Sequence, residues 1–143
     1  MQNKVVIITG ASSGIGKALV YEFAKRGAKI AMGARNLDEL QKIETDLKSR
    51  GVDALSVQTD VTRELDCKNL VEKTVERFGK IDVLVNNAGR THFVQHSDLD
   101  GMKSEYFDDI FALNVKGTFF MCRAAADALK KSHGVIINIT SIA

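Results

Sequence analysis

The sequence contains no proline and no tryptophan, and only two cysteines, Cys67 and Cys122. Average usage would predict about seven prolines in a chain of this length, so proline-rich linkers are excluded. Two distant cysteines cannot staple a small fold, and they suit reduced thiols in a cytoplasmic chain. No apolar run approaches the roughly 18 residues of a membrane span. Residues 1–4 lead into a strand-like run without the pattern of a signal peptide, so we expect a cytoplasmic protein.

Charge is nearly balanced, since 20 Lys and Arg against 18 Asp and Glu give a formal net charge of +2. Such a balance lacks the basic surface that binds DNA, RNA or an anionic membrane. Hydrophobic residues make up 45% of the 143 residues and charged residues 27%, as is typical of a globular protein. We therefore expect one domain over residues 1–143, with a small molecule rather than nucleic acid or a membrane as its partner.

Short apolar runs alternate with amphipathic segments along the whole chain. The first run, residues 4–9, is continuously apolar and β-branched, which is typical of a strand buried on both faces of a parallel sheet, and residues 28–34 form a second buried run. The predicted strands are 4–9, 28–34, 53–58, 81–86 and 134–139. The predicted helices, with their caps, are 15–27, 36–51, 62–79 and 104–131. This alternation predicts the α/β class, a doubly wound parallel sheet with right-handed crossovers.

The predicted helix 104–131, which Ser104 is expected to cap, is apolar on two sides. One side carries Ile110, Leu113, Gly117, Phe120 and Ala124, and the other carries Phe107, Phe111, Val115, Phe119 and Cys122. A helix with two apolar sides is normally covered on both. One side can face the sheet, and the other needs either a missing part of the chain or a second subunit. We expect a homodimer or homotetramer formed through this helix.

A glycine-rich turn, Thr9-Gly-Ala-Ser-Ser-Gly-Ile-Gly16, joins the first predicted strand to the first helix. Its first glycine permits a tight turn, the second lets the backbone approach a ligand, and the third lets the helix pack closely on the strand. Free amides at the start of that helix would point at a bound phosphate. A tight turn without a ligand is the simpler alternative, but the position in a βαβ unit favours a dinucleotide site. We expect this site to include Gly10, Ser12, Ser13, Gly14, Ile15 and Gly16.

The end of the second predicted strand indicates which dinucleotide is bound. An acidic residue is expected there when the ribose carries a free 2′-hydroxyl, but the strand ends in Met32-Gly-Ala34 and Arg35 follows. A small residue followed by a guanidinium leaves space and positive charge for a 2′-phosphate. We therefore expect NADP(H) to be favoured over NAD(H). An arginine that only faces solvent is the alternative.

Together these motifs resemble the short-chain dehydrogenase/reductase family. The resemblance rests on Thr-Gly-x-x-x-Gly-x-Gly, on Asp60-Val61 after the third strand, and on Asn86-Asn-Ala-Gly89 after the fourth. It covers the whole chain and implies a Rossmann fold with strand order 3-2-1-4-5, cut short relative to the family's seven strands. It also implies that Asp60 and Val61 flank the adenine ring. Asn86, Asn87, Ala88 and Gly89 would brace the centre of the sheet and border a ribose of the cofactor.

The same resemblance implies two catalytic residues. Asn114 matches the asparagine of the family's catalytic tetrad, and Ser141 matches its serine. Ser141 also follows the last predicted strand, at the sheet edge where ligands bind, and its hydroxyl could donate to a substrate oxygen as negative charge develops. Asparagine is a mediocre helix former, so a role in holding a relay water would explain Asn114. A turn serine and a tolerated polar residue are the simpler alternatives.

The family's general acid/base is a tyrosine followed four residues later by a lysine, on the helix that would come after residue 143. Tyr21 and Lys25 have this spacing, but they lie on the first predicted helix and are expected to face other helices or solvent. The resemblance implies an NADP-dependent oxidoreductase that transfers hydride between the cofactor and a carbonyl or secondary alcohol. The alternative is a catalytically silent dinucleotide-binding module that lacks the Tyr/Lys pair.

His92 and His96 are four residues apart, as metal ligands on a helix can be. They fall in a polar loop predicted over 89–103, and the sequence offers no evident third ligand. We therefore expect no metal site.

Overall fold

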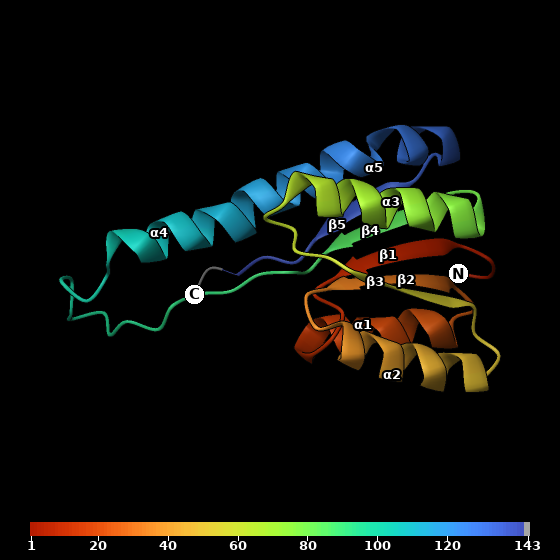
Figure 1. Ribbon diagram of the computed structural model, residues 1–143, viewed down its shortest axis with the longest axis horizontal. Helices are drawn as coiled ribbons and strands as arrows, with labels where there is room; N and C mark the ends of the chain where they lie inside the picture. The colour runs from red at the N-terminus through yellow and green to blue at the C-terminus, as the bar shows by residue number, and fades with distance from the viewer. Residues whose placement is uncertain (142–143) are drawn as a thin grey trace.

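In the computed structural model, which describes residues 1–141, five parallel strands form one sheet in the order β3-β2-β1-β4-β5 (Figure 1). The strands are β1 (Val5–Thr9), β2 (Lys29–Ala34), β3 (Ala54–Gln58), β4 (Val83–Asn86) and β5 (Val135–Asn138). At the centre, Ile7 of β1 is in register with Ala31 of β2 on one side and with Leu84 of β4 on the other. The predicted doubly wound sheet and its strand order are confirmed.

Helices cover both faces of this sheet. On one face lie α1 (Gly14–Lys25) and α2 (Leu37–Ser49), and on the other lie α3 (Glu64–Phe78) and α5 (Thr118–Ser132) (Figure 1). Because strand side chains alternate between faces, Ile8 packs in the cluster under α1 and α2 and Ile7 in the cluster under α3 and α5. Each fully buried side chain of this size stabilises the fold by roughly 1.5–3 kcal/mol.

Local signals set the helix ends. The Asn36 side chain accepts a hydrogen bond from the Glu39 amide at 3.1 Å and so caps α2, as predicted. Gly79 ends α3 in the left-handed conformation at φ +79°, which glycine adopts without strain. Gly27 follows α1 with φ +81°.

The predicted helix 104–131 is helical from 104 to 132 but is not one α-helix. It consists of α4 (Ser104–Ile110), a π-helical segment η1 (Phe111–Gly117) and α5. The expectation that Ser104 caps it is wrong by one residue, because Lys103 holds the cap position and Ser104 is already helical. Helix ends fray, so a boundary expected from sequence commonly shifts by one residue. The π segment, by contrast, is a different type of helix from the α-helix that was predicted.

The π segment changes which side chains of this helix meet the sheet. Residues four apart form the buried row: Leu113, Gly117, Met121, Ala125 and Leu129. Phe120 and Ala124, expected on this side, are partly buried and pack against the core, and Cys122, expected on the other side, does the same. The expected second apolar side is present, since Phe107, Phe111, Val115 and Phe119 are all more than half exposed.

The expectation that the last predicted strand, 134–139, is buried is wrong, because every residue of β5 is exposed. Val135, Ile136 and Ile137 are 53%, 43% and 39% exposed. The reason is position, because β5 is the edge strand of the sheet over residues 1–141 and pairs with β4 alone.

At the amino ends of the strands, the buried carboxylate of Asp82 joins β1 to β4. It accepts hydrogen bonds from the Val5 amide and the Lys4 ammonium, both at 2.9 Å, and lies 2.9 Å from the Lys80 ammonium. Burial of this carboxyl opposes ionisation, but the Val5 amide and the two lysines outweigh burial and lower the pKa of Asp82. In the part of the chain that the structure describes, no helix is long and apolar enough to cross a membrane.

Candidate functional site

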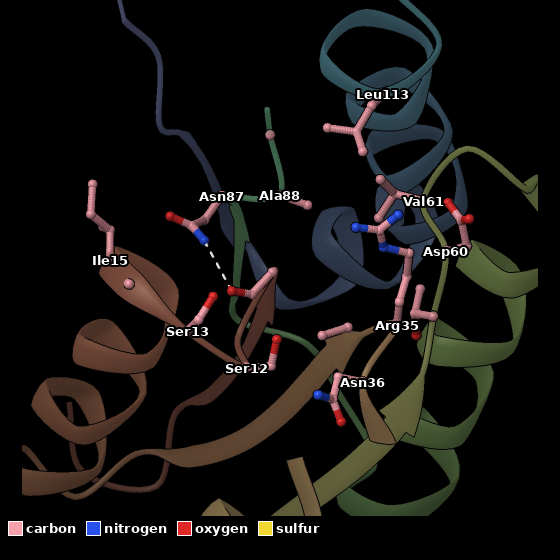
Figure 2. A pocket seen from close by; sticks show the side chains of 15 residues that line it. Ser12, Ser13, Ile15, Arg35, Asn36, Asp60, Val61, Asn87, Ala88 and Leu113 are labelled. Atoms are coloured by element: carbon pink, nitrogen blue, oxygen red, sulfur yellow. Dashed lines mark hydrogen bonds between the residues drawn. The ribbon is translucent and has the colours of Figure 1, made fainter. Parts of the chain in front are cut away.

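A cavity of about 400 Å³ lies at the carboxyl ends of the strands, where the sequence predicted a ligand (Figure 2). Every predicted dinucleotide-binding residue except Gly16 and Asn86 lines it: Gly10, Ser12, Ser13, Gly14, Ile15, Arg35, Asp60, Val61, Asn87, Ala88 and Gly89. Of four further lining residues, Ala34 is the small residue expected to leave space beside Arg35, and three were not predicted in the site, namely Asn36, Thr59 and Leu113. Thr59 directly follows β3 and Asn36 lies two residues after β2, so the rule that ligands bind at strand ends could have found both.

The glycine-rich turn brings the backbone up to the cavity without a side chain in between. Gly14 has φ +52°, and a Cβ built on it would meet nothing within 4 Å. Ser13 precedes α1 but makes no side-chain capping hydrogen bond, and no acidic residue stands in the first turn of α1. The amides that begin α1 therefore remain available to an anion in the cavity. This arrangement fits a phosphate group.

Gly16 lies behind the cavity rather than on its wall. A Cβ on Gly16 would come within 2.3 Å of the Gly10 carbonyl oxygen and 2.5 Å of Asn87 Nδ2. Only glycine therefore lets α1 pack this closely on the end of β1. Gly10 itself needs the left-handed region, at φ +65°.

The end of β1 and the end of β4 are tied together beside the turn. Thr9 Oγ1 accepts hydrogen bonds from the amides of Asn87 and Ala88 at 3.0 and 3.1 Å. The Asn87 side-chain amide donates to the carbonyl oxygens of Thr9 at 3.0 Å and of Gly10 at 3.4 Å, the latter bond being drawn in Figure 2. These bonds set the position of Ala88 on the cavity wall.

Arg35, Asp60 and Val61 lie together on one side of the cavity, across from Ser13 and Ile15 of the turn (Figure 2). Burial of the Asp60 carboxyl opposes ionisation, but hydrogen bonds from the Thr62 hydroxyl and amide and the nearby Arg35 charge outweigh burial and lower its pKa. The Asp60 carboxylate thus already has partners, while Arg35 keeps an exposed guanidinium.

Val61 is supported from behind by two residues. A Cβ on Gly117 would meet Val61 Cγ2 at 2.8 Å, so the π segment packs directly on this side chain. The buried thiol of Cys67 donates to the Val61 carbonyl oxygen at 3.4 Å. Burial raises the pKa of Cys67 to about 12, so this thiol stays protonated at neutral pH.

Asn86, the last residue of β4, is 4% exposed, and its side chain reaches β5 rather than the cavity. Its Nδ2 donates to Asn138 Oδ1 at 2.9 Å and approaches Cys122 Sγ at 3.3 Å. Its Oδ1 has no partner among the described residues. Asn86 therefore joins the two strands at the level of the cavity.

The two expected catalytic residues do not line this cavity. Asn114 is in the π segment, and both ends of its side chain bond the backbone of Arg90: Oδ1 accepts from the Arg90 amide at 3.0 Å, and Nδ2 donates to the Arg90 carbonyl oxygen at 2.8 Å. Its own carbonyl oxygen accepts from the Thr118 hydroxyl at 2.9 Å. Ser141 is exposed and lies beyond β5.

Neither of the chain's two tyrosines is among the lining residues. Tyr21 faces α2, where Arg50 lies over its ring, and burial together with a hydrogen bond to Asp46 raises its pKa. A catalytic tyrosine base needs a lowered pKa, so the Tyr21–Lys25 spacing has no catalytic meaning. Tyr106 stacks on His92, whose Nε2 lies 2.7 Å from Asp109 Oδ2. Over residues 1–141, no three His, Cys, Asp or Glu side chains gather as metal ligands.

The curated proteins that are similar in sequence include several oxidoreductases and dehydrogenases. An uncharacterized oxidoreductase of Thermotoga maritima is 42% identical over 141 residues, which are 98% of this chain and 54% of that protein. The 11-beta-hydroxysteroid dehydrogenase A of Sesamum indicum is 39% identical over 96% of this chain and 39% of its own length. The chain thus spans about half the length of the curated relatives it matches first.

Solved structures match as well. The alcohol dehydrogenase of Thermococcus sibiricus, complexed with 5-hydroxy-NADP, superposes with a TM-score of 0.91 and 35% identity over 98% of this chain and 59% of its own. The 3-ketoacyl-(acyl-carrier-protein) reductase of Brucella melitensis, complexed with NADH, gives 0.89 and 35% over 98% and 58%. The short chain dehydrogenase family profile matches residues 4–143. The chain belongs to the short-chain dehydrogenase/reductase family.

Proposed function

We propose that this chain forms the dinucleotide-binding part of an oxidoreductase that transfers hydride between NADP(H) and the carbonyl or secondary alcohol of a small molecule. The observation that carries the proposal is the open backbone of the glycine-rich turn. A phosphate can approach Gly14 directly, and the N-terminus of α1 faces it with uncapped amides and no competing carboxylate.

The side of the cavity formed by Arg35, Asp60 and Val61 supports binding of the adenosine half. Ala34 leaves space at the end of β2, and the exposed Arg35 guanidinium can form a bidentate pair with a 2′-phosphate. The Thr62 amide and hydroxyl hold the Asp60 carboxylate, so Arg35 is not its hydrogen-bonding partner and stays available to a phosphate. We therefore favour NADP(H) over NAD(H), although the similar structures were solved with either type of cofactor.

When bound, the nicotinamide ring supplies or accepts the hydride at its C4 atom. The chain's own contribution is to hold and orient the dinucleotide through Gly10–Gly16 and Asn87–Gly89. Ser141 is proposed to donate a hydrogen bond to the substrate oxygen. Asn114, in the π segment, is proposed to hold the water of the proton relay. The proton itself is proposed to come from a group outside these 143 residues, since both tyrosines lie away from the cavity.

The location of Tyr21 and Tyr106 outside the cavity lining also favours a second candidate function, a module that binds the dinucleotide but catalyses no reaction. The two candidates differ in one observable. Both bind NADPH, but only the complete protein of the first candidate, with its proton donor, oxidises NADPH when a panel of ketones, aldehydes and 3-oxoacyl thioesters is added. The panel would also identify the substrate class.

For the assembly, we propose pairing of two copies through the exposed stripe Phe107, Phe111, Val115 and Phe119, as a homodimer or as half of a homotetramer. These residues are four apart and stand on one helical surface, which can pair with itself about a twofold axis. Exposed aromatic patches of this kind mark interaction surfaces.

The test is a fluorescence titration with NADPH and NADH. We expect wild type to prefer NADPH, and Arg35→Ala to weaken NADPH binding by roughly 10–100-fold, the value of a lost charged bidentate pair, with little effect on NADH. Arg50→Ala is the matched control, because it removes one arginine that pairs with Asp46 on the far end of α2. No binding of either nucleotide by folded wild type would refute the proposal.

A further inference from the structure

We propose that Asp109 is a positioning residue that locks the loop 90–103 onto α4 and thereby fixes Gly89 in the wall of the cavity. The inference deepens the proposed function and rests on it for the claim that this wall contacts a dinucleotide. The locking of the loop stands on contacts alone.

Both carboxylate oxygens of Asp109 are used to hold the loop. Oδ1 accepts a hydrogen bond from the Arg90 guanidinium, and Oδ2 lies 2.7 Å from His92 Nε2. Tyr106, on the same helix, stacks on the His92 ring with the ring centres 4.2 Å apart and the planes 7° from parallel. One helical residue thus holds two loop residues, and a second fixes the plane of one of them.

The backbone at the same point is held by the π segment. Asn114 bonds both the amide and the carbonyl of Arg90, and Asn114 Oδ1 lies 3.4 Å from where a Cβ of Gly89 would be. Arg90 is therefore held by its side chain through Asp109 and by its backbone through Asn114. Gly89, immediately before it, lines the cavity.

The rest of the loop has little else to hold it. Phe93 and Leu99 are 91% and 84% exposed. Hydrogen bonds farther along join residues three apart, as from the Gly101 amide to Asp98 Oδ1 at 2.9 Å. Figure 1 shows this segment and α4 running together as an arm that projects beyond the sheet. The contacts of Asp109 thus decide whether the loop 90–103 stays packed on α4.

The wall that Asp109 fixes is not the adenosine side of the cavity. Arg35, Asp60 and Val61 form that side, and the glycine-rich turn holds the phosphates (Figure 2). Gly89 lies in the segment that follows β4, whereas Arg35 follows β2, and these two strands stand on opposite sides of β1. Loss of the Asp109 contacts should therefore weaken contacts with the half of a dinucleotide beyond the phosphates and spare the adenosine half.

Limited proteolysis tests the locking of the loop. Trypsin cleaves after Lys103 and Arg90, at the two ends of the loop, and mass spectrometry identifies each fragment. We expect Asp109→Asn to raise the cleavage rate at Lys103 by roughly tenfold, as fits the loss of two partly exposed charged contacts. Asp108→Asn is the matched control, because Asp108 is the neighbouring exposed acid on α4 and makes none of these contacts. Asp109→Glu should restore part of the protection. Equal rates in Asp109→Asn and Asp108→Asn would overturn the proposal.

Binding of two probes tests the effect on the wall. Asp109→Asn should weaken NADPH several-fold and leave adenosine 2′,5′-bisphosphate unchanged, whereas a merely destabilised protein would lose affinity for both. Unchanged NADPH affinity, or equal losses for both probes, would overturn the role of Asp109 at the cavity. Failure of wild type to bind NADPH or NADH would instead refute the proposed function, and the proteolysis comparison would still decide the locking of the loop.

Discussion

Thr9 and Asn87 hold each other across the point where the strand order reverses. The Thr9 hydroxyl oxygen accepts the Asn87 amide at 3.0 Å, and the Asn87 side chain returns a bond to the Thr9 carbonyl oxygen at 3.0 Å. β1 pairs with β2 on one side and with β4 on the other. The segments that follow β1 and β4 lead to helices on opposite faces of the sheet, which leaves a crevice between them. The reciprocal bonds fix the floor of that crevice before any ligand arrives.

Thr9→Val should reveal how much this pairing contributes. Valine keeps the shape of threonine but leaves the amides of Asn87 and Ala88 without their acceptor. We expect a loss of about 2 kcal/mol in the free energy of unfolding, measured with urea. Thr45→Val is the control, since Thr45 is exposed on α2 and bonds only the preceding helical turn. A midpoint shift no larger than that of the control would contradict this interpretation.

Substitution by alanine should mainly reduce stability at Gly16 and mainly reduce nucleotide affinity at Gly14. Gly16→Ala drives a Cβ against the Gly10 carbonyl oxygen and should destabilise the fold by about 3 kcal/mol. Gly14→Ala meets no neighbour and strains only φ, costing about 1 kcal/mol. The same methyl at Gly14 points into open space where a phosphate should lie, so nucleotide affinity should fall more than stability. Thermal unfolding and NADPH titration of both variants separate the two effects.

Asp82 should make stability depend on acidic pH. Its pKa in the folded protein is lowered, so its contribution is fully present above the ordinary carboxyl pKa of about 3.9 and is lost as pH falls through the lower folded value. Asp82→Asn should lower stability at pH 7 by about 1–2 kcal/mol and flatten the acid limb of the curve. Urea unfolding from pH 7 to pH 3 provides the measurement. Glu72→Gln, at an exposed position of α3, should leave that slope intact.

The two cysteines should differ in reactivity in the folded protein. The pKa of Cys67 is raised to about 12 by burial, so almost no thiolate forms at pH 8. We expect thiol reagents to modify Cys67 only at the rate of unfolding, and stoichiometric modification of both cysteines once urea is added. Peptide mapping assigns each adduct. Rapid labelling of Cys67 in the folded protein would show that the support behind Val61 opens readily.

The exposed stripe on α4, η1 and the start of α5 predicts a concentration-dependent association. Phe111→Glu places a charge at its centre and should shift the protein toward monomer in sedimentation experiments, because an unpaired charge in an apolar contact is strongly unfavourable. Lys130→Glu, at an exposed position of α5, is a control for the change in charge. If the association state of Phe111→Glu equals that of wild type, another surface is responsible.

Sequence patterns predicted the fold well because both of its signals are local. β-branched runs and glycine-terminated helices repeat along the chain, and the buried row of Ile7, Ala31 and Leu84 needs only that alternation. The cavity lining was largely predicted for the same reason, since Gly10 to Ile15 and Arg35 each directly follow a strand.

What the sequence did not predict depends on contacts between distant segments. The π segment forms where Gly117 meets Val61, 56 positions earlier in the chain, and no period within residues 104–131 encodes that contact. Nothing in the residues around Asn114 indicates that its side chain bonds the backbone of Arg90, which lies 24 positions earlier in the chain. The exposure of β5 likewise follows from the absence of a second neighbouring strand in the described sheet, not from its apolar composition.

The π segment also takes up one extra residue between two helices. A π turn holds one residue more than an α turn, so that residue fits into a wider turn without rotating α5 relative to α4. Removing one residue from 111–117 should therefore restore a regular α-helix and leave Met121, Ala125 and Leu129 in the core. The same deletion within α5 would rotate the residues after it by about 100° and carry them out of the core. Single-residue gaps should thus be tolerated within 111–117 and in the loop 90–103 far better than within 118–132.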